Sequence, residues 1–521
     1  MIIMKRITIF TVLAISAMLL PTGAFAQNMW DAYRYSQQFN EGTARSAAMG
    51  NASVALGGDL GGISINPAAS GVYRYSEFVI TPSVTFANSS VNYLGNTTDE
   101  SKGRFGFSNF GYISTFETGR SDYGLINWNL SVAFNKTNNF TSRMGAQGKT
   151  AESSWLGSLA QRTNGVYAPS MDMNNQNDPF YSGSGSWTSI LGWNTSLLDT
   201  LPDSDSYYRG ATENLDGLNI VTGGELEQAY VKETVGNTSE AVINFGGNIS
   251  NKLFFGVNFG IVSIWYKHTE SYSERAVNPN QFQSGFSCFT HNYTYSTSGT
   301  GINLKAGIIY LPVKGLRLGA SISTPTWMYL HEEYEESMES NFTDGYSQWL
   351  ASPLGTYDYR INTPFRWNIG AAYTFGQIAA ISIDYENANY SKMKMVDDNY
   401  SLAFSEDNQE IKRNFQSSNI IRAGAEIKPL PSLAIRAGYQ YYSSCYKYDN
   451  NAIQIGSIGL GYASAGGFFA DLAYQQQIKK SEESFQLYDD ITDNGTIITA
   501  APVGQNRFGN WKLLLSLGIR F

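Results

Sequence analysis

The stretch WKLLLSLGIRF, residues 511–521, ends the chain and decides its fold. Every second residue from Trp511 to Phe521 is large and apolar, whereas the intervening positions hold Lys, Ser, Gly and Arg, and only Leu514 breaks this alternation. A period of two residues is the signature of a β-strand with one apolar and one polar face. The segment is therefore predicted to be a strand whose outward face meets an apolar environment.

The same alternation recurs throughout the chain from Glu77 onward and predicts about fourteen strands. The predicted strands are 77–88, 103–114, 125–136, 239–249, 253–268, 293–310, 315–330, 357–374, 378–391, 413–428, 433–445, 453–463, 468–478 and 510–521. An all-β fold follows, and we expect a transmembrane antiparallel β-barrel.

The connections between these strands alternate between short and long, as they do in bacterial membrane barrels. The short ones carry turn residues at Pro312–Gly315, Gly376, Pro429–Pro431 and Gly466-Gly467. An even number of strands then places both ends of the barrel on the periplasmic side. A soluble β-sandwich also has alternating strands, but it has no reason to sort its loops by length.

The composition agrees with a barrel and excludes helical membrane spans. Of 521 residues, 34 are Tyr, 29 Phe, 10 Trp and 51 Gly, and only 15% are charged. Such a composition suits a barrel with aromatic girdles. After the first 26 residues no apolar run reaches the roughly 18 to 20 residues that a spanning helix needs, and the mean hydropathy is −0.25.

Residues 1–26 match a secretory signal, so the chain divides into three expected parts. Lys5 and Arg6 precede an apolar run from Ile7 to Leu20, and Ala24-Phe25-Ala26 forms a small-x-small cleavage site. Residues 27–76 form a pre-barrel segment rich in Gly and Ala. Residues 77–521 form the barrel, with a long external loop at about 137–238. We expect localisation in a Gram-negative outer membrane, with its lipid as a partner.

The net charge and the two cysteines limit which partners and covalent links are expected. Without Lys5 and Arg6 the chain has 33 basic and 44 acidic residues, a net charge of −11, which argues against a nucleic-acid partner. Cys288 and Cys445 both fall near external strand ends, so either a disulfide or two free thiols is expected. No cofactor is expected.

Several charged residues alternate with the apolar positions and should line the lumen near the periplasmic turns. They are Arg317, Arg366, Asp384, Glu386, Arg422, Glu426, Arg436, Asp471 and Arg520. One interpretation of this belt is an ion-pair network that braces the wall, because buried charges need partners. The other is a ring that docks a plug or binds a carboxylate on a ligand path. About fourteen strands enclose a lumen that something must fill.

The pre-barrel segment contains GTARSAAMGNASVA at residues 42–55, Gly57-Gly58-Asp59, and then Asn66-Pro67-Ala68. In this order, before about fourteen strands, these motifs resemble the N-terminal hatch of FadL/TodX outer-membrane transporters. The resemblance covers the hatch, the strand count and topology, and the C-terminal Phe521 as an aromatic assembly signal. Family members often carry paired acidic residues where this chain has Gly58-Asp59.

The resemblance implies transport of hydrophobic small molecules, such as long-chain fatty acids or aromatic hydrocarbons, through a plugged barrel. It implies hatch or gating roles for Gly42, Arg45, Gly50, Asp59, Asn66, Pro67 and Ala68. Asn66 before Pro67 is biased to an extended backbone and Pro67 fixes φ, although Asn-Pro also commonly starts an ordinary turn. Gly57, Gly58, Gly61 and Gly62 would supply the flexibility for a shift.

The sequence also bears on two functions other than transport, catalysis and surface binding. Neither Gly-x-Ser-x-Gly nor His-Glu-x-x-His is present, so an enzyme is not expected. The long loops also suit a secretion adaptor or a surface-binding or haem-receptor platform with a protein partner. His268, His291 and His331 fall at the external ends of neighbouring predicted strands. One interpretation is a metal-binding cluster at the rim, and the other is three unrelated polar residues. Lumen-facing Asn127, Asn129, Ser131, Ala133 and Asn135 would leave room for a lateral exit.

Overall fold

The computed structural model describes residues 28–173, 178–217, 219–400, 402–449, 451–493 and 495–521, and the expected signal sequence lies outside them. These residues form a closed antiparallel barrel of 14 strands, which confirms the predicted fold class. The ring closes where β1 (Glu77–Tyr93) pairs with β26 (Val503–Arg520), for example Phe78 with Ile519.

The remaining strands follow the chain around the ring, each paired with its neighbours. They are β2 (Asn96–Glu117), β3 (Leu125–Asn139) with β4 (Ser142–Thr150), β9 (Leu226–Ile249), β10 (Leu253–Ala276), β11 (Phe286–Tyr310), β12 (Leu316–Ser323) with β13 (Trp327–Phe342), β15 (Gly355–Asn362) with β16 (Arg366–Phe375), β17 (Ala379–Asn389), β19 (Ser417–Leu430), β20 (Leu433–Tyr442), β21 (Ile453–Ala463) and β22 (Phe468–Gln477). Short strands β14 (Ser347–Ala351), β18 (Lys394–Val396) and β23 (Ser481–Gln486) extend the sheet.

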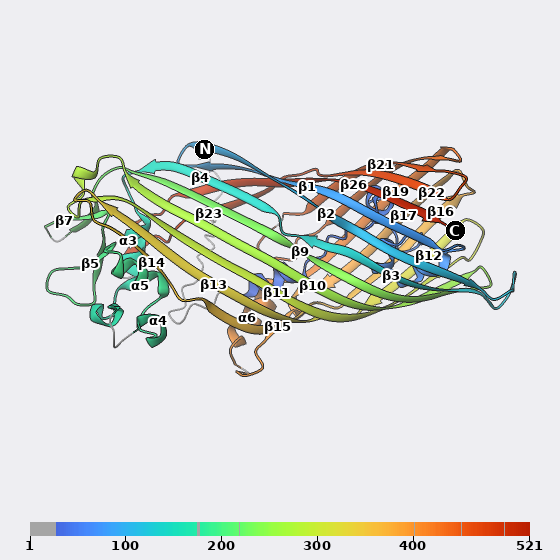
Figure 1. The fold of residues 1–521 in the computed structure, drawn as a ribbon, viewed down its shortest axis with the longest axis horizontal. Helices are drawn as coiled ribbons and strands as arrows, with labels where there is room; N and C mark the ends of the chain where they lie inside the picture. Colours follow the sequence, from blue (N-terminus) through green and yellow to red (C-terminus); the bar gives the residue numbers. More distant parts are fainter. Residues whose placement is uncertain (1–27, 174–177, 218, 401, 450, 494) are drawn as a thin grey trace, which may run out of the picture.

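The barrel is much taller on one side than on the other (Figure 1). Strands β9, β10 and β11 have 24, 24 and 25 residues, whereas β20, β21 and β22 have 10, 11 and 10. Ten residues are enough for a tilted strand to cross a bilayer. We call the end with the short connections, where Phe521 lies, the turn end, and the opposite end the cap end.

At the cap end the strands continue well beyond their predicted limits. The 14-residue connection expected between the first two strands is a tight hairpin at Leu94-Gly95, and the 24-residue connection before residue 293 shrinks to residues 277–285. Beyond the apolar zone, segments such as 269–276 have polar residues on both faces. The alternation that marks a strand is therefore missing there, although the backbone still pairs.

Two predicted strands are interrupted at prolines. The seventh breaks at residues 324–326, around Pro325, and the eighth at 363–365, around Pro364. Proline has no N–H to donate to a sheet. The two breaks lie side by side, and Thr326 and Thr363 join them because the Thr326 N–H donates to Thr363 Oγ1 at 2.8 Å.

The outer surface carries a continuous apolar zone that runs around the barrel. On β26, Leu513, Leu515, Leu517 and Ile519 are each between 37% and 47% exposed, although all are large and apolar. Leu514, which breaks the alternation in the sequence, points inward and packs fully buried against Ala44, Ala47 and Ala48. The exception to the pattern is therefore a contact with the material inside the lumen.

Residues 151–225 form a folded unit at the cap end, which we call the cap. It contains α3 (Trp155–Thr163), η3 (Ala168–Met171), α4 (Pro179–Ser182), α5 (Trp187–Asn194) and the hairpin strands β5 (Leu198–Thr200), β6 (Tyr208–Gly210), β7 (Glu213–Asp216) and β8 (Asn219–Thr222). Leu156, Leu159, Ile190 and Leu191 form its core with Phe286 and Phe289 of β11. The single long loop expected at 137–238 is thus two strand extensions and a packed domain.

The remaining short elements lie outside the wall of the barrel or in its connections. They are η4 (Pro279–Gln281), η5 (Tyr390–Lys392), α6 (Ser405–Asn414) and the hairpin of β24 (Ile491–Asp493) and β25 (Thr496–Thr499). Within the part of the chain that is described, no helix is both long and apolar enough to cross a membrane.

Candidate functional site

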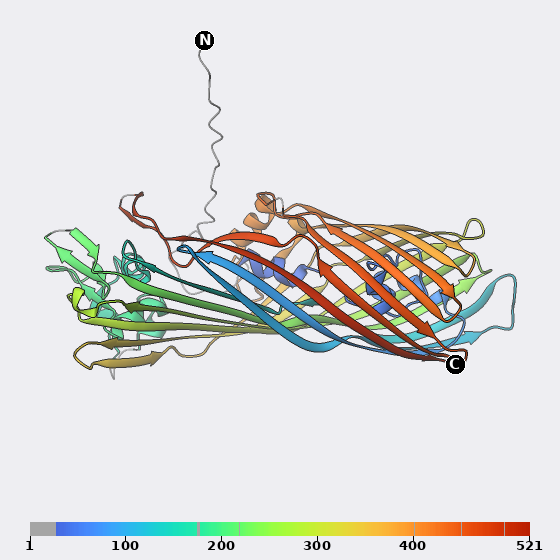
Figure 2. The same cartoon turned by 90° about the horizontal axis from the view of Figure 1, so that it is seen from above.

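The pre-barrel segment lies inside the lumen, as the view in Figure 2 shows for its blue helices. It contains α1 (Met29–Ser36), α2 (Ala44–Ala48), η1 (Gly62–Ser64) and η2 (Pro67–Val72). We call residues 28–76 the hatch. Asn28 and Thr43 cap the two α-helices through side-chain oxygens. Between its short helices the hatch has little regular structure, so its backbone groups need partners elsewhere.

The wall supplies those partners through polar side chains that donate to hatch carbonyl oxygens. The donors include Asn127 (to Tyr73), Asn129 (to Ser70), Asn244 (to Pro67), Asn258 (to Ile63), Lys305 (to Ser64), Ser321 (to Ile65), Arg366 (to Ser36), Ser457 (to Ala48) and Gln475 (to Ala47). Each of these contacts replaces the water that the carbonyl would otherwise bind. The hatch is therefore held around most of the ring.

Glycines in the wall let the hatch backbone come this close. A Cβ added at Gly256 would lie 2.2 Å from the carbonyl oxygen of Pro67, one at Gly319 2.2 Å from that of Val54, and one at Gly438 2.1 Å from the nitrogen of Gly50. Gly424 faces the Met49 carbonyl in the same way, and Gly307 and Gly459 face the side chains of Asn66 and Ala48. Lumen-facing glycines, about one on each of these strands, are a sequence signal of the hatch contact that the alternation analysis did not use.

Glu41 joins the hatch to three strands near the seam of the barrel. Its fully buried carboxylate accepts from Lys512 Nζ of β26 at 2.7 Å and from Ser108 Oγ of β2 at 2.6 Å, and lies 3.3 Å from Lys136 Nζ of β3. Two cations and a hydroxyl balance a charge that burial alone would strongly destabilise. The sequence analysis missed Glu41, although an acidic residue directly before a Gly/Ala-rich segment was the available signal.

The hatch residues implied by the family resemblance contact one another and the wall. Asp59 accepts from Thr43 Oγ1 and from the Gly61 N–H, while Arg45 donates to the Gly58 carbonyl and lies 3.4 Å from Glu426. Gly42 and Gly50 both have φ of 63°, a left-handed backbone that favours glycine.

Asn66, Pro67 and Ala68 form the start of η2. Asn66 Oδ1 accepts from the Ala68 N–H at 3.0 Å, and its amide donates to the carbonyls of Val54 (2.6 Å) and Ile308 (3.2 Å). Asn66 thus caps η2 and joins it to the hatch turn at Val54 and to the wall at Ile308. Pro67 occupies the first helical position, where its missing N–H costs nothing.

The charged belt is present, and it pairs both with itself and with the hatch. Glu386 lies 2.7 Å from Arg366 and from Arg422, while Arg436 lies 2.6 Å from Glu426 and 2.5 Å from Asp471. Asp384 accepts from the Val54 N–H and Arg317 donates to the Leu56 carbonyl, both in the hatch. Arg520 pairs with Glu77, 2.7 Å away, across the seam. Lys305–Glu240, at 2.7 Å, is a further lumen pair.

Toward the cap end of the lumen, buried aromatic and methionine side chains of the wall pack in one cluster around the hatch helix α1. We call it the aromatic chamber, and its wall includes Tyr266, Tyr295, Met328, Tyr359, Met395 and Phe415. Helix α1 enters it with Trp30, Tyr33 and Tyr35, of which Trp30 meets Phe415 at a ring-centroid distance of 5.8 Å. The hatch thus packs against apolar parts of the wall as well as against its polar side chains.

The polar residues expected to leave room for a lateral exit serve mainly as hatch anchors. Asn127 and Asn129 bind hatch carbonyls as described, and Asn135 donates to Ser64 Oγ at 2.9 Å. The wall itself is interrupted nearby. The ladder between β2 and β3 ends at Asn109–Asn135, and residues 96–108 and 142–150, all of them described, have no ladder between them. The Phe39 and Glu41 N–H groups pair instead with the carbonyls of Thr137 and Lys136.

The three histidines do not form a cluster. His268 is buried and lies 2.8 Å from Glu270, His291 lies 3.1 Å from Glu336, and His331 lies 2.7 Å from Asp358 on the outer surface. Within the described residues no group of three or more His, Cys, Asp and Glu side chains could hold a metal ion. Both cysteines are free: Cys288 is partly buried on β11, and Cys445 is buried near α6.

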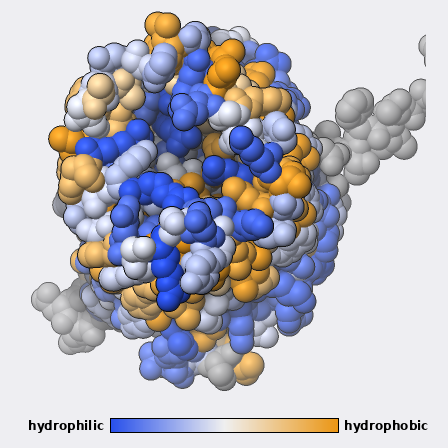
Figure 3. All heavy atoms as spheres, turned by 90° about the vertical axis from the view of Figure 1, so that its right-hand side faces the viewer, coloured by the Kyte–Doolittle hydropathy of each residue, from blue (hydrophilic) through white to orange (hydrophobic). Residues whose placement is uncertain are grey.

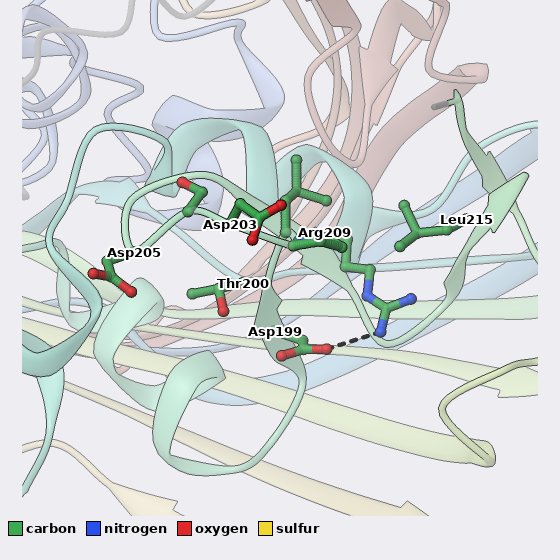
Figure 4. Close-up of a pocket in the computed structure, with 9 residues that line it drawn as sticks. Asp199, Thr200, Asp203, Asp205, Arg209 and Leu215 are labelled. Carbon is green, nitrogen blue, oxygen red and sulfur yellow. Dashed lines mark hydrogen bonds and ion pairs between the residues drawn. The ribbon is translucent and has the colours of Figure 1, made fainter. Parts of the chain in front are cut away.

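Two hollows lie at opposite ends of the molecule. One of about 560 Å³, on the cap, is lined by Asp199, Asp203 and Asp205, with Arg209 paired to Asp199 (Figure 4). It is external and acidic, so it does not fit an apolar solute. The other, of about 220 Å³, lies at the turn end, between hatch residues such as Arg45 and belt residues such as Glu426. Figure 3 shows this end, with hydrophilic residues around a central depression.

Comparison with known proteins supports the fold. No family model and no curated protein sequence matches the chain. Among solved structures, the P. putida toluene transporter TodX has a TM-score of 0.51 at 14% identity, over 93% of this chain and 99% of its own. A Pseudomonas aeruginosa FadL homologue has a TM-score of 0.51 at 12% identity, over 93% of this chain and 100% of its own. The structural match confirms the predicted FadL/TodX-type barrel with a segment before its first strand.

Proposed function

We propose that this chain carries apolar small molecules across a bacterial outer membrane, and that the hatch must shift before a molecule can pass. The observation that carries the proposal is the hatch itself, which wall side chains hold across the lumen and whose helix α1 is packed in the aromatic chamber. An apolar molecule gains about 25 cal/mol for each Å² that leaves water. The aromatic chamber offers such a surface, with long-chain fatty acids or aromatic hydrocarbons as candidate substrates.

The continuous apolar zone on the outer surface supports placement in a membrane, with the cap end outside. The short strands β20–β22 have the length needed to span a bilayer. The long strands β9–β11 would then project beyond the lipid and support the cap. The fold match to TodX, described as a toluene transporter, agrees with this placement.

For the exit path, we propose the interruption between β2 and β4. The wall there has no ladder, and the hatch residues Phe39–Glu41 cover the lumen side. Movement of this hatch segment would open the lumen sideways toward lipid. Adding a disulfide between residues on β2 and β4 should therefore slow uptake of an apolar solute, whereas unchanged uptake would favour an exit at the turn end.

A hatch-to-wall disulfide tests the central proposal. A Cβ at Gly459 lies 2.5 Å from the Cβ of Ala48, so a small adjustment would allow an Ala48→Cys/Gly459→Cys bond. The protein would also carry Cys288→Ser and Cys445→Ser. Uptake of toluene or a long-chain fatty acid should stop when the bond forms and return on reduction. Uptake that continues with the bond intact would contradict a moving hatch.

Deletion of residues 42–66 tests the plug by a second route. The deletion should raise single-channel conductance in planar bilayers, because it removes α2, η1 and their contacts with the wall. Conductance that is steady in the native protein and unchanged by the deletion would show that the hatch does not close the lumen.

The packed cap favours one alternative, a surface-binding or secretion-adaptor role. It has its own apolar core, and its β7–β8 hairpin exposes Ile220 and Val221. A stable protein partner that co-purifies with the intact chain but not with a chain lacking residues 151–225 would support this role. Bound apolar ligand in both preparations would favour transport.

A further inference from the structure

The hollow of about 220 Å³ at the turn end lies between the hatch and the wall, and we call it the turn-end hollow. The hatch contributes Arg45 and Arg74 to its lining, and the wall contributes Arg317 of β12 and Lys428 of β19. Among the described residues that line it, Glu426 is the one carboxylate. The chain as a whole has nine more acidic than basic residues, so four cations around one carboxylate are a local exception.

The carboxylate of Glu426 is already shared among several cations. It lies 2.6 Å from Arg436, 3.4 Å from Arg45 and 3.8 Å from Lys428. One carboxylate carries one negative charge and cannot balance all the cations of the lining, so a surplus of positive charge remains in the hollow. A cleft whose walls carry one sign of charge concentrates ions of the opposite sign.

Arg317 and Arg74 show this surplus most directly, because neither belongs to an ion pair among the described residues. Arg317 donates to the Leu56 carbonyl, and Arg74 donates to Asn251 Oδ1 at 2.6 Å. Arg45 and Arg74, whose charges act on Arg317, have the same sign as Arg317 itself. A guanidinium has five N–H donors, so both arginines keep donors for a ligand.

The lining of the turn-end hollow also has an apolar part. It includes Leu56 and Val72 of the hatch and Ala380 of β17, and Leu56 and Ala380 belong to one buried apolar cluster. Arginine binds a carboxylate through two parallel hydrogen bonds, so arginines beside an apolar surface suit a carboxylate with an apolar group. Pockets for drug-sized molecules begin at about 300 Å³, so this hollow suits a smaller ligand.

We propose that the turn-end hollow binds a small carboxylate anion with a short apolar or aromatic group, and that this anion holds the hatch closed. Arg45 and Arg74 of the hatch and Arg317 and Lys428 of the wall would share its charge. A ligand that binds only where the hatch and the wall meet stabilises the closed state by mass action. The inference goes beyond the proposed function, because it requires only the closed hatch and not the passage of a solute.

Benzoate and the benzylammonium ion, which share a ring and differ in charge, make the test of binding specific. Each would be titrated by equilibrium dialysis against the full chain in a non-ionic detergent at neutral pH, with protein-free micelles as the blank. Benzoate should bind at least tenfold more tightly than benzylammonium, and at least tenfold more tightly than acetate, which lacks the ring. Equal binding of benzoate and benzylammonium would overturn the anion site. Equal binding of benzoate and acetate would overturn its apolar part.

Variants connect the binding to the arginines of the turn-end hollow. Arg317→Ala removes a guanidinium that belongs to none of the ion pairs described, so the barrel should fold and bind benzoate at least tenfold more weakly. Arg74→Gln, at an exposed position, should weaken binding severalfold and covers the case in which Arg317→Ala fails to fold. Arg209→Ala, in the acidic hollow on the cap, is the matched control and should leave the affinity for benzoate unchanged. Unchanged affinity in Arg74→Gln and Arg317→Ala would overturn the site.

The effect on the hatch is measured by limited proteolysis. Benzoate at ten times its dissociation constant should slow cleavage of the hatch about tenfold, because only the ligand-free fraction can open. The same concentration should have little effect on Arg317→Ala. Cleavage of the native hatch that benzoate does not slow would overturn its role in closing the hatch. These results are independent of transport, since toluene uptake that the hatch disulfide blocks would stand even if benzoate fails to bind.

Discussion

The hatch and the cap are both inserted against the same barrel, but they are stabilised in opposite ways. The cap has a core of its own, with fully buried Leu156, Ile190 and Leu191. The hatch is rich in Gly, Ala and Ser, and its carbonyls accept hydrogen bonds from side chains of the wall. The cap is therefore held by an apolar core that it shares with wall residues such as Phe286 and Phe289, whereas the hatch is held mainly by hydrogen bonds to the wall. A segment held in this way can move between alternative sets of hydrogen bonds.

The largest expected effect comes from Glu41→Gln, which should release the hatch and leave the cap intact. The change leaves Lys136 and Lys512 without their shared carboxylate, and breaking a buried ion pair costs about 3 to 5 kcal/mol. Limited proteolysis should cut the hatch faster while residues 151–225 stay protected. As a control, Glu410→Gln removes the ion pair with the exposed Arg413. It should change the proteolysis rate of neither the hatch nor the cap. Equal protection of the hatch in the Glu41 variant would contradict the comparison.

The reverse experiment is Leu156→Ala, which should open the cap without loosening the hatch. Truncation of a fully buried leucine costs roughly 2 to 5 kcal/mol, because it leaves a cavity. Hydrogen exchange measured by mass spectrometry should show faster exchange in residues 151–225 and unchanged exchange in residues 42–66. If both regions exchange faster, the two are coupled and the comparison fails.

A smaller effect is expected from Gly438→Ala on β20. The added methyl would meet the Gly50 nitrogen at 2.1 Å, and such overpacking costs about 1 to 3 kcal/mol. The hatch should shift, and single-channel recordings should then show brief openings. Gly456→Ala on the adjacent strand, where the nearest atom is the end of Ile478 at 3.1 Å, is the matched control. Silent channels in both variants would show that the hatch does not depend on wall glycines.

The smallest effect concerns the pH dependence of the cap. Burial raises the pKa of Glu213 to about 7, from its ordinary 4.5. The folded cap then binds the proton more tightly than the unfolded cap, so stability is full below about pH 4.5 and falls as pH rises toward 7. Opening of the cap, followed by proteolysis, should be about sevenfold more frequent at pH 6 than at pH 5. Glu213→Gln should abolish this dependence, and a dependence that persists would exclude Glu213 as its source.

The sequence located the turn end of the barrel well and the cap end poorly. The strand starts predicted at residues 253, 433 and 468 and the strand end predicted at 463 agree with β10, β20, β22 and β21, because turn residues meet the apolar alternation there. At the cap end, the segments 269–276 and 286–292 lie beyond the apolar zone, and their two faces are similar. Their pairing is fixed by the neighbouring strands rather than by their own polarity.

The candidate site was predictable where charge marks it. Seven of the nine belt residues lie in ion pairs, whereas Asp384 and Arg317 bind hatch backbone groups rather than opposite charges. A sequence cannot show that a carbonyl several hundred residues away is the partner. The same limit explains why Glu41 and the lumen glycines were missed, since each has meaning only once the ring is closed.

The hydrogen bond from the Ala44 N–H to Ser516 Oγ joins residues 472 positions apart, and it has a consequence for assembly. The hatch is the first part of the mature chain to leave the ribosome, but its last binding partners are made at the very end. It cannot complete its contacts with the wall until the fourteenth strand is in place. Residues 42–71 contain no aromatic side chain, and this lowers the tendency of the waiting segment to aggregate. The small residues that let the hatch pack in the lumen thus also suit a segment that is synthesised first and docks last.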